Sequence, residues 1–298
     1  MPHWFLSTRA HSVGGPVSGD VKVIDSDRLG FIGDLTPELV AAVRGQEVFF
    51  AVHGFNVNQK HGIEHLNFWL ENVDIGNAVK IGVLWPGDCF IPIFVDYVVE
   101  GHEAIRSGQM LSEFLNKNFN SAAALSFASH SLGARVVLQT ISGLNRSSVH
   151  RVLLMAGAID NNCLTNEYTN AANKVEQISL LASIRDAVLA AAFPLGNPIQ
   201  GIIDSGHPYY HAALGREGPT KPDEIGSRLH LGWQIPKELG YGHLDYLPGQ
   251  AIPAKYPQPC QIPPAQPVPP SGTPAQLAGH DSLWKPAFSA GFATCRYK

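Results

Sequence analysis

The side chain in this sequence best suited to covalent chemistry is the hydroxyl of Ser131, within the segment S-H-S-L-G at 129–133. An apolar run without Pro or Gly precedes this segment, and residues 134–139 after it suit a helix. This order predicts a buried strand, a sharp turn with a serine at its tip, and a helix. A serine presented in this way can attack a carbonyl once a neighbouring base takes its proton. Gly133, two residues after Ser131, permits the close strand–helix approach that the turn requires. Ser129, two residues before Ser131, occupies the position at which turns of this kind usually have Gly.

A second strand with a turn at its end supplies groups that complement a nucleophile. Residues 47–52 form a continuous apolar run that leads into H-G-F at 53–55, where the glycine lets the backbone turn. The backbone N–H groups of Phe55 and Leu132 are expected to form an oxyanion hole, which stabilises negative charge on a carbonyl oxygen. The side chains expected to contact the substrate beside them are His53, Trp85 and His130.

A serine nucleophile needs a histidine base and a carboxylate that orients the ring, and the residues alone leave two choices for each. Asp160 and Asp186 both follow expected strands, and His243 and His280 stand in similar surroundings. We predict His243 as the base, because an expected last strand at 228–233 precedes it. The segment before His280 is proline-dense and cannot supply a central strand, since Pro lacks the N–H of a strand ladder.

Strands that alternate with helices must position these groups. Buried strands are expected over residues 47–52, 79–85, 124–128, 151–159, 177–183 and 228–233, with edge strands over 3–8 and 21–24. Helices are expected over residues 36–43 with Thr36 as N-cap, 58–70 with Asn58 as N-cap, 102–119 and 166–174. Such βαβ units bring the carboxyl ends of the strands to one edge of a mainly parallel sheet, where active sites lie. The apolar segment 89–99 is expected to line or cover the site.

A competing metal-site hypothesis comes from the segment H-G-I-E-H at 61–65. On a helix, His61 and His65 would share one face with Glu64 beside them, as in a zinc-peptidase helix. Gly62 inside the helix and the lack of a clear third ligand speak against this alternative.

Composition and length set outer limits on the kind of protein. The chain has 298 residues, 45% of them hydrophobic, and a formal net charge of −4 with no strong basic run. These values fit a globular protein and speak against nucleic acid or an anionic membrane surface as the main partner. The four cysteines are scattered, and neither a signal peptide nor a membrane span is predicted, so we expect a cytoplasmic protein. We expect one domain over residues 1–298, with a Pro-rich C-terminal extension at about 248–298.

Six segments in order give the chain a resemblance to the α/β-hydrolase superfamily, and more narrowly to a bacterial hydrolase-like branch of unknown function. They are V-H-G-F-N at 52–56, L-W-P-G-D at 84–88, S-H-S-L-G-A-R at 129–135, S-I-R-D-A-V-L at 183–189, A-L-G-R-E-G-P at 213–219 and G-H-L-D-Y-L at 242–247. The resemblance implies an α/β-hydrolase fold, a mainly parallel central sheet flanked by helices. It also implies a triad of Ser131, Asp186 and His243, with Asp186 preferred because 183–186 match the acid loop of the family.

The activity implied by this resemblance is hydrolysis of a small-molecule carboxylic ester through an acyl-enzyme, without a cofactor or a metal. Besides the zinc peptidase, the remaining alternative is a hydrolase-fold protein that binds a ligand without catalysis. The oligomeric state is not indicated by the sequence.

Overall fold

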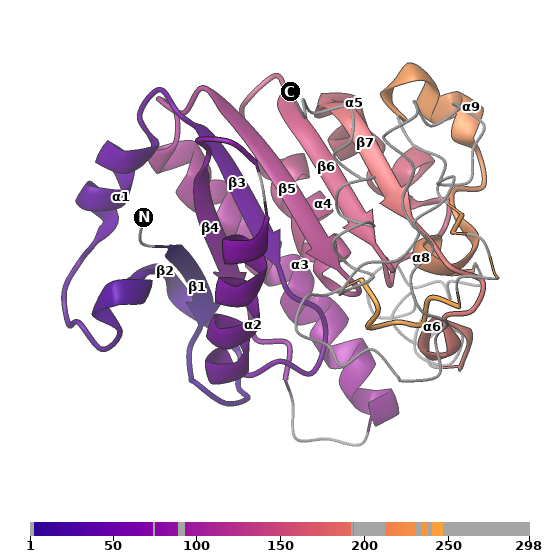
Figure 1. Ribbon diagram of the computed structural model, residues 1–298, viewed down its shortest axis with the longest axis horizontal. Coiled ribbons are helices and arrows are strands. Elements are labelled where there is room, and N and C mark those ends of the chain that lie inside the picture. The colour runs from indigo at the N-terminus through magenta and orange to yellow at the C-terminus, as the bar shows by residue number, and fades with distance from the viewer. Residues whose placement is uncertain are drawn as a thin grey trace.

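The computed structural model describes residues 3–73, 75–88, 93–191, 193, 212–229, 234–235, 237 and 240–246, with the backbone alone at 72 and 93–100. The described strands form one seven-stranded sheet in the order β2-β1-β4-β3-β5-β6-β7. Figure 1 shows this sheet with helices on both of its faces. The strands are β1 (Trp4–Arg9), β2 (Val17–Asp25), β3 (Glu47–Val52), β4 (Val79–Leu84), β5 (Ala124–His130), β6 (Val149–Met155) and β7 (Val175–Leu181).

The sheet is parallel except at one edge. β1 pairs antiparallel with β2, whereas β1 with β4, β4 with β3, β3 with β5, β5 with β6, and β6 with β7 all pair parallel. Parallel neighbours need crossover connections, and these leave the carboxyl ends of the strands together at one edge of the sheet. The predicted fold class, a mainly parallel α/β sheet flanked by helices, is confirmed.

The middle of the sheet forms the protein core. Phe50 of β3 and Phe127 of β5 are register partners, and their rings stack with centroids 4.7 Å apart. Strands of this kind are covered by helices on both faces, which is why they read as continuous apolar runs rather than as alternating ones.

The helices lie on both sides of this core. They are α1 (Thr36–Val43), α2 (Gln59–Asn72), α3 (Ile93–Asn118), α4 (Gly133–Gly143), α5 (Thr169–Lys174), α6 (Ala187–Ala191), α8 (Leu214–Glu217) and α9 (Pro222–Ile225), with 3-10 turns η1 (Ser26–Arg28), η2 (Cys163–Thr165) and η3 (Gly226–Arg228). In Figure 1, α2 lies in front of the sheet, and α3 and α4 lie behind it. α3 and α4 approach closely, because a Cβ on Gly108 would stand only 2.6 Å from the Cβ of Gln139.

Of the two helix caps predicted for the first 60 residues and the edge position predicted for residues 3–8, one cap is observed. Asn58 is the N-cap of α2, and its Oδ1 accepts a hydrogen bond from the His61 backbone N–H at 3.0 Å. The cap predicted for α1 was wrong, because Leu35 takes that place and the Thr36 backbone N–H donates to Asp34 Oδ1 at 2.9 Å. The edge position predicted for residues 3–8 was also wrong, since β1 lies between β2 and β4.

Several other predicted boundaries shift. β6 ends at Met155, four residues before the predicted end at 159, because Ala156 adopts a left-handed φ of 47°. The helix predicted at 166–174 is the shorter α5, and the 3-10 turn η2 precedes it. Of the segment 89–99, expected to line or cover the site, residues 89–92 lie outside the described part of the chain, and the rest is the start of α3.

Some predictions concern residues outside the described part of the chain. Residues 230–233 of the expected last strand are among them, although Leu229 and Gln234 on either side form parallel bridges to Ile178 and Ala182, within and just after β7. The expected Pro-rich extension at 248–298, which includes His280, is outside it as well.

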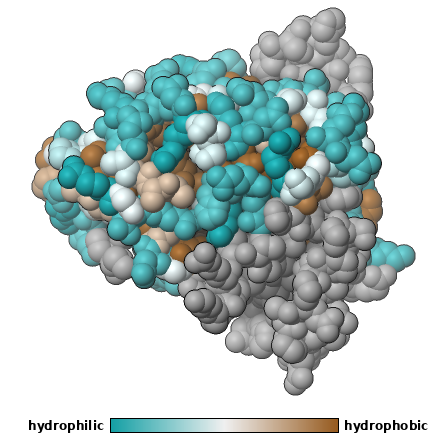
Figure 2. Space-filling model, turned by 90° about the horizontal axis from the view of Figure 1, so that it is seen from above, coloured by the Kyte–Doolittle hydropathy of each residue, from teal (hydrophilic) through white to brown (hydrophobic). Residues whose placement is uncertain are grey.

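The surface seen from above in Figure 2 is mainly hydrophilic where it is described, with hydrophobic residues in small groups. Among the described helices, none combines the length and the apolar character needed to cross a membrane.

Candidate active site

Ser131 lies at the tip of a strained turn between β5 and α4. Its φ is 54°, a left-handed value that residues other than Gly rarely adopt. The turn holds this conformation through its own backbone: the Ser131 N–H donates to Met155 O at 3.0 Å, and the Ser131 carbonyl accepts from Ala134 and Ala158. A strained serine fixed from three sides presents its hydroxyl at the carboxyl edge of the sheet.

Two glycines bring the end of β3 against this turn. A Cβ on Gly133 would stand 2.5 Å from the His53 carbonyl oxygen and 3.0 Å from that of Val52. A Cβ on Gly54 would stand 2.9 Å from the Cβ of Ser131. The loop after β3 and the start of α4 therefore meet at a distance that excludes any side chain at these two positions.

The ring of His243 connects Ser131 to Asp186. His243 Nε2 lies 2.8 Å from Ser131 Oγ, and Nδ1 lies 2.7 Å from Asp186 Oδ2. A carboxylate only accepts, so Nδ1 carries the ring proton in the neutral imidazole and Nε2 is left to accept from the hydroxyl. This arrangement can draw the proton from Ser131 Oγ and so raise its nucleophilicity.

Asp186 is held so that one oxygen serves the ring and the other serves the chain. Its side chain is fully buried, and Oδ1 accepts from the Leu189 backbone N–H at 2.8 Å in the first turn of α6. A carboxylate with both oxygens occupied cannot swing away from His243 without losing a buried hydrogen bond.

The loop that carries His243 is anchored at both of its ends. Ser183 Oγ donates to the Tyr241 carbonyl at 2.7 Å, and the Gly242 N–H donates to Asp245 Oδ2 at 2.6 Å. The buried rings of Tyr241 and Tyr246 pack edge to face, 5.3 Å apart. The loop is therefore tied to the core on either side of the histidine.

The alternative acid, Asp160, lies elsewhere, and the alternative base, His280, is outside the described part of the chain. Asp160 forms an isolated bridge with Ala213, and its carbonyl accepts from Cys163 as η2 begins. Asp186, and not Asp160, is the residue whose carboxylate is hydrogen-bonded to the His243 ring.

The two backbone N–H groups predicted for an oxyanion hole belong to Leu132, directly after the serine, and to Phe55, directly after the Gly54 that approaches Ser131. Leu132 is the N-cap of α4, so its N–H lies at the positive end of the helix dipole. Within the described residues, neither the Leu132 N–H nor the Phe55 N–H donates to an acceptor. Their role as donors to an oxyanion stays a prediction.

His53 and Trp85 lock the loop between β3 and α2. The Trp85 indole N–H donates to the His53 carbonyl at 2.8 Å, and the two rings stack with centroids 5.6 Å apart. His53 Nδ1 lies 2.8 Å from Gly54 O, and Nε2 lies 3.3 Å from the Trp85 backbone N–H. Burial, with a smaller effect of the Arg9 charge, lowers the pKa of His53 to about 3, so the ring is neutral. The contact of these residues with substrate stays a prediction.

His130, the third residue expected to contact substrate, is buried directly before the serine. Its Nε2 lies 2.6 Å from the carbonyl oxygen of His243, and the two rings are 4.8 Å apart. Burial and the nearby His243 lower the pKa of His130 to about 3.

An interaction that the sequence did not suggest holds the loops from the side of β1. The buried Arg9 forms an ion pair with Asp88 and donates to Trp85 O at 2.8 Å and Val57 O at 3.3 Å. Val57 is in turn bridged to Gly87. Arg9 is the last residue of β1, and no sequence motif marks it; the one signal that could have led to it is the acidic residue Asp88, which ends L-W-P-G-D.

The predicted metal-binding histidines are exposed on the surface of α2. The rings of His61 and His65 stack with centroids 6.2 Å apart, and Asn58 Nδ2 lies 3.2 Å from His61 Nδ1. Gly62 faces the sheet, where a Cβ would meet Leu84 Cδ2 at 2.7 Å. No group of three or more potential ligands occurs among the described residues.

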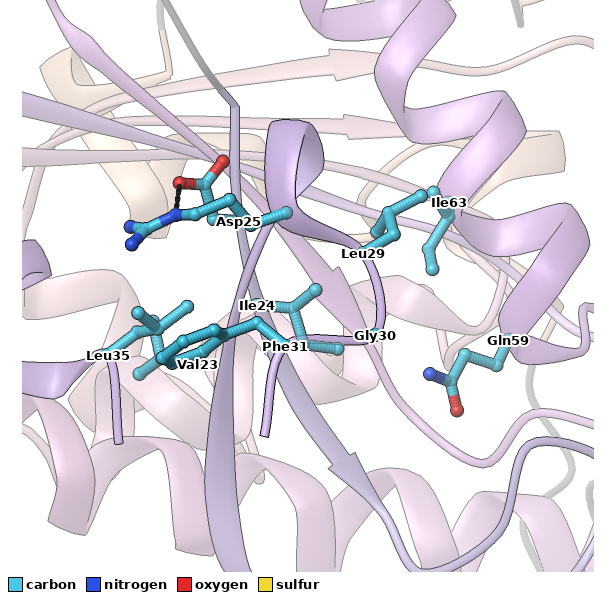
Figure 3. Close-up of a pocket in the computed structure, with 10 residues that line it drawn as sticks. Val23, Ile24, Asp25, Leu29, Gly30, Phe31, Leu35, Gln59 and Ile63 are labelled. Atoms are coloured by element: carbon cyan, nitrogen blue, oxygen red, sulfur yellow. Dashed lines mark hydrogen bonds and ion pairs between the residues drawn. The ribbon is translucent and has the colours of Figure 1, made fainter. Parts of the chain in front are cut away.

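One cavity of about 290 Å³ lies away from this serine, between β2, η1 and the first turns of α2. Figure 3 shows its apolar lining and the ion pair of Asp25 with Arg28 at one side. The apolar residues that line the cavity are Val23, Ile24, Leu29, Phe31, Leu35 and Ile63.

Comparison with known proteins gives a fold family and no assigned activity. None of the curated proteins matches the chain. Phospholipase PlaB from Legionella pneumophila is similar in two solved structures. In complex with thio-NAD the identity is 13% over 46% of this chain and 37% of that one, with a TM-score of 0.25. In the other structure the identity is 14%, the match covers 60% of this chain and 34% of the phospholipase chain, and the TM-score is 0.23.

The chain thus spans little more than a third of the length of these phospholipase chains. The model of one family, by contrast, matches residues 35–225, which is more than half of the chain and includes β3 to β7 and the serine turn. The chain therefore belongs to the family described as alpha/beta hydrolase of unknown function (DUF900).

Proposed function

We propose that the protein is a serine hydrolase that cleaves carboxylic esters, with Ser131 as nucleophile, His243 as general base and Asp186 as the carboxylate that orients the ring. The observation that carries this proposal is the pair of hydrogen bonds from Ser131 Oγ to His243, 2.8 Å, and from His243 to Asp186, 2.7 Å. Membership of an α/β-hydrolase family supports it at the level of the reaction class.

In the first half of the proposed reaction, Ser131 Oγ attacks the ester carbonyl carbon while His243 Nε2 takes the hydroxyl proton. The carbonyl oxygen becomes an oxyanion, to which Phe55 and Leu132 donate their backbone N–H groups. Each such donor is worth about 3–4 kcal/mol in the transition state. His243 then passes its proton to the departing alcohol, and the acyl group stays on Ser131.

In the second half, a water molecule gives its proton to His243 Nε2 and attacks the acyl carbon. Collapse of this intermediate returns the proton to Ser131 Oγ and releases the carboxylic acid. Asp186 keeps its negative charge throughout and stabilises the imidazolium that forms in both halves. Thioesters and amides offer the same carbonyl carbon, so the leaving group separates these substrate classes.

The experiment is hydrolysis of a series of p-nitrophenyl esters by the purified full chain and its variants. Ser131→Ala should remove turnover while the circular dichroism spectrum is unchanged. Ser129→Ala is the matched control, because the Ser129 hydroxyl is buried in the same segment and makes no hydrogen bond within the described residues. Turnover near the wild-type rate in Ser131→Ala would contradict the proposal, and no turnover by the wild-type chain would favour a binding protein.

A further inference from the structure

The imidazole of His130 makes a direct link between the serine turn and the loop of the base. His130 Nε2 lies 2.6 Å from the backbone carbonyl oxygen of His243, across 113 residues of sequence. His130 is bonded through its own peptide to Ser131, whose Oγ lies 2.8 Å from the His243 ring. The three residues therefore close a small ring: one peptide bond and two hydrogen bonds.

The position of the proton on the His130 imidazole follows from its hydrogen-bond partner. A carbonyl oxygen only accepts, so His130 Nε2 must carry a proton and donate it. The side chain is 3% exposed, and the His130 ring lies 4.8 Å from that of His243. Burial lowers the pKa of His130 to about 3. His130 thus stays neutral beside the base. Its single ring proton is donated to the His243 carbonyl, which leaves the His243 ring nitrogen to Ser131.

The link differs from the other contacts of the loop in where it acts. Ser183 and Asp245 hold Tyr241 and Gly242, which precede the base. Within the described residues, the hydrogen bond from His130 is the one that reaches the backbone of His243 itself. Without it, the ring remains tethered by Asp186, but the peptide that carries it can move relative to the serine.

We propose that His130 is a positioning residue, which fixes the distance between Ser131 and His243 by donating its Nε2 proton to the carbonyl of the base. The inference rests on the proposed serine hydrolase function and assigns His130 a role that acts through the carbonyl of His243, in place of the substrate contact expected from the sequence. A displacement of about 1 Å between reacting groups typically lowers the rate by about 100-fold. The effect should therefore appear in kcat and leave KM nearly unchanged.

The kinetic test compares His130→Leu with His130→Gln. Leu fills the space without a donor, whereas the Gln amide nitrogen can reach the position of Nε2 and donate to the same carbonyl. His130→Leu should lower kcat about 10- to 100-fold, with KM changed less than about threefold. His130→Gln should restore kcat to within about fivefold of the wild-type value. Equal kcat values in all three proteins, or equal losses in both variants, would overturn the proposal.

A matched control is His150→Leu, which removes a half-buried histidine near the amino end of β6, where it pairs with Glu47. It should leave kcat at the wild-type value. A fall equal to that of His130→Leu would show a general effect of losing a histidine.

A second readout does not depend on turnover. In protein with ¹⁵N-labelled histidine, the His130 Nε2 proton should exchange slowly with solvent and show a nuclear Overhauser contact to the backbone of residues 243–244. If this proton signal is present in a chain that hydrolyses no ester, the hydrogen bond from His130 to His243 is supported and the proposed function is rejected. Absence of the signal in an active enzyme would reject the link alone.

Discussion

His243 Nε2 lies 2.8 Å from Ser131 Oγ, although 112 residues separate the two in the sequence. The contact brings the loop at 240–246 to the carboxyl edge of the sheet, where the turn after β5 presents the serine. Asp186, from the turn after β7, completes the line of hydrogen bonds. Three segments that share no local sequence pattern thus meet at one point, and the following predictions probe how they do so.

Asp186→Asn should lower kcat by about 10⁴, because an amide favours the wrong ring tautomer and leaves the imidazolium without its charge partner. The Oδ1 of an Asn can still accept from the Leu189 N–H, so the fold should persist. Asp160→Asn is the matched isosteric control and should change kcat less than about tenfold. Steady-state kinetics decides, and a larger loss in Asp160→Asn would exchange the roles of the two carboxylates.

Gly133→Ala should destabilise the protein by about 3 kcal/mol or more, since its Cβ would meet two backbone oxygens that cannot move independently. Gly62→Ala should change stability by less than about 1 kcal/mol. Its Cβ would meet only the tip of Leu84, and Ala is the better helix former. Urea unfolding of both variants measures the difference. Equal losses would mean that the loop after β3 does not press on α4 as described.

Acid should weaken the folded state through two buried histidines. Burial lowers the pKa of His53 and of His130 to about 3, from 6.5 in the unfolded chain. Between these values only the unfolded chain binds the protons, so the stabilisation is complete above pH 6.5 and is lost as pH falls. Each ring contributes about 1.4 kcal/mol per pH unit in that window.

Replacing either ring by Gln should therefore reduce the loss of stability between pH 7 and pH 5 by about 2 kcal/mol, and the double variant by about twice that. Denaturant unfolding at the two pH values measures it. An unchanged pH dependence would mean that these rings are protonated in the folded protein.

Hydrolysis should survive prolonged treatment with EDTA, because the proposed chemistry uses only side chains and backbone N–H groups. The stacked rings of His61 and His65 lie on the exposed side of α2, and the Asn58 side chain is hydrogen-bonded to His61 Nδ1. His61→Ala should likewise leave kcat unchanged. Stoichiometric zinc whose removal abolishes activity would instead support the metal-peptidase alternative.

The sequence predicts the central sheet and the serine turn well, because both depend on local patterns. The apolar runs of β3 and β5 are continuous, since these strands are buried on both faces. The place of β1 inside the sheet was missed, because it depends on parallel pairing with β4, which lies far along the chain. The role of Arg9 was missed for the same reason: its partners come from three separate loops.

The site could be predicted only as far as single segments carry a signature. The turn around Ser131 and the close approach at Gly133 follow from residue type and order. The bond from His130 to the His243 carbonyl was not predictable, because a backbone acceptor leaves no mark on the sequence. The early end of β6 was also hidden, since Ala156 has no residue-type preference for its left-handed φ of 47°.

The most direct test of the central claim, that Ser131 is an activated nucleophile, is reaction of the full chain with a fluorophosphonate, followed by intact mass and peptide mapping. The account predicts that one phosphonyl group adds to the wild-type chain and maps to Ser131. It predicts no addition in Ser131→Ala and much slower addition in His243→Ala. A wild-type chain that stays unlabelled, or a label on another residue that persists in Ser131→Ala, would contradict it.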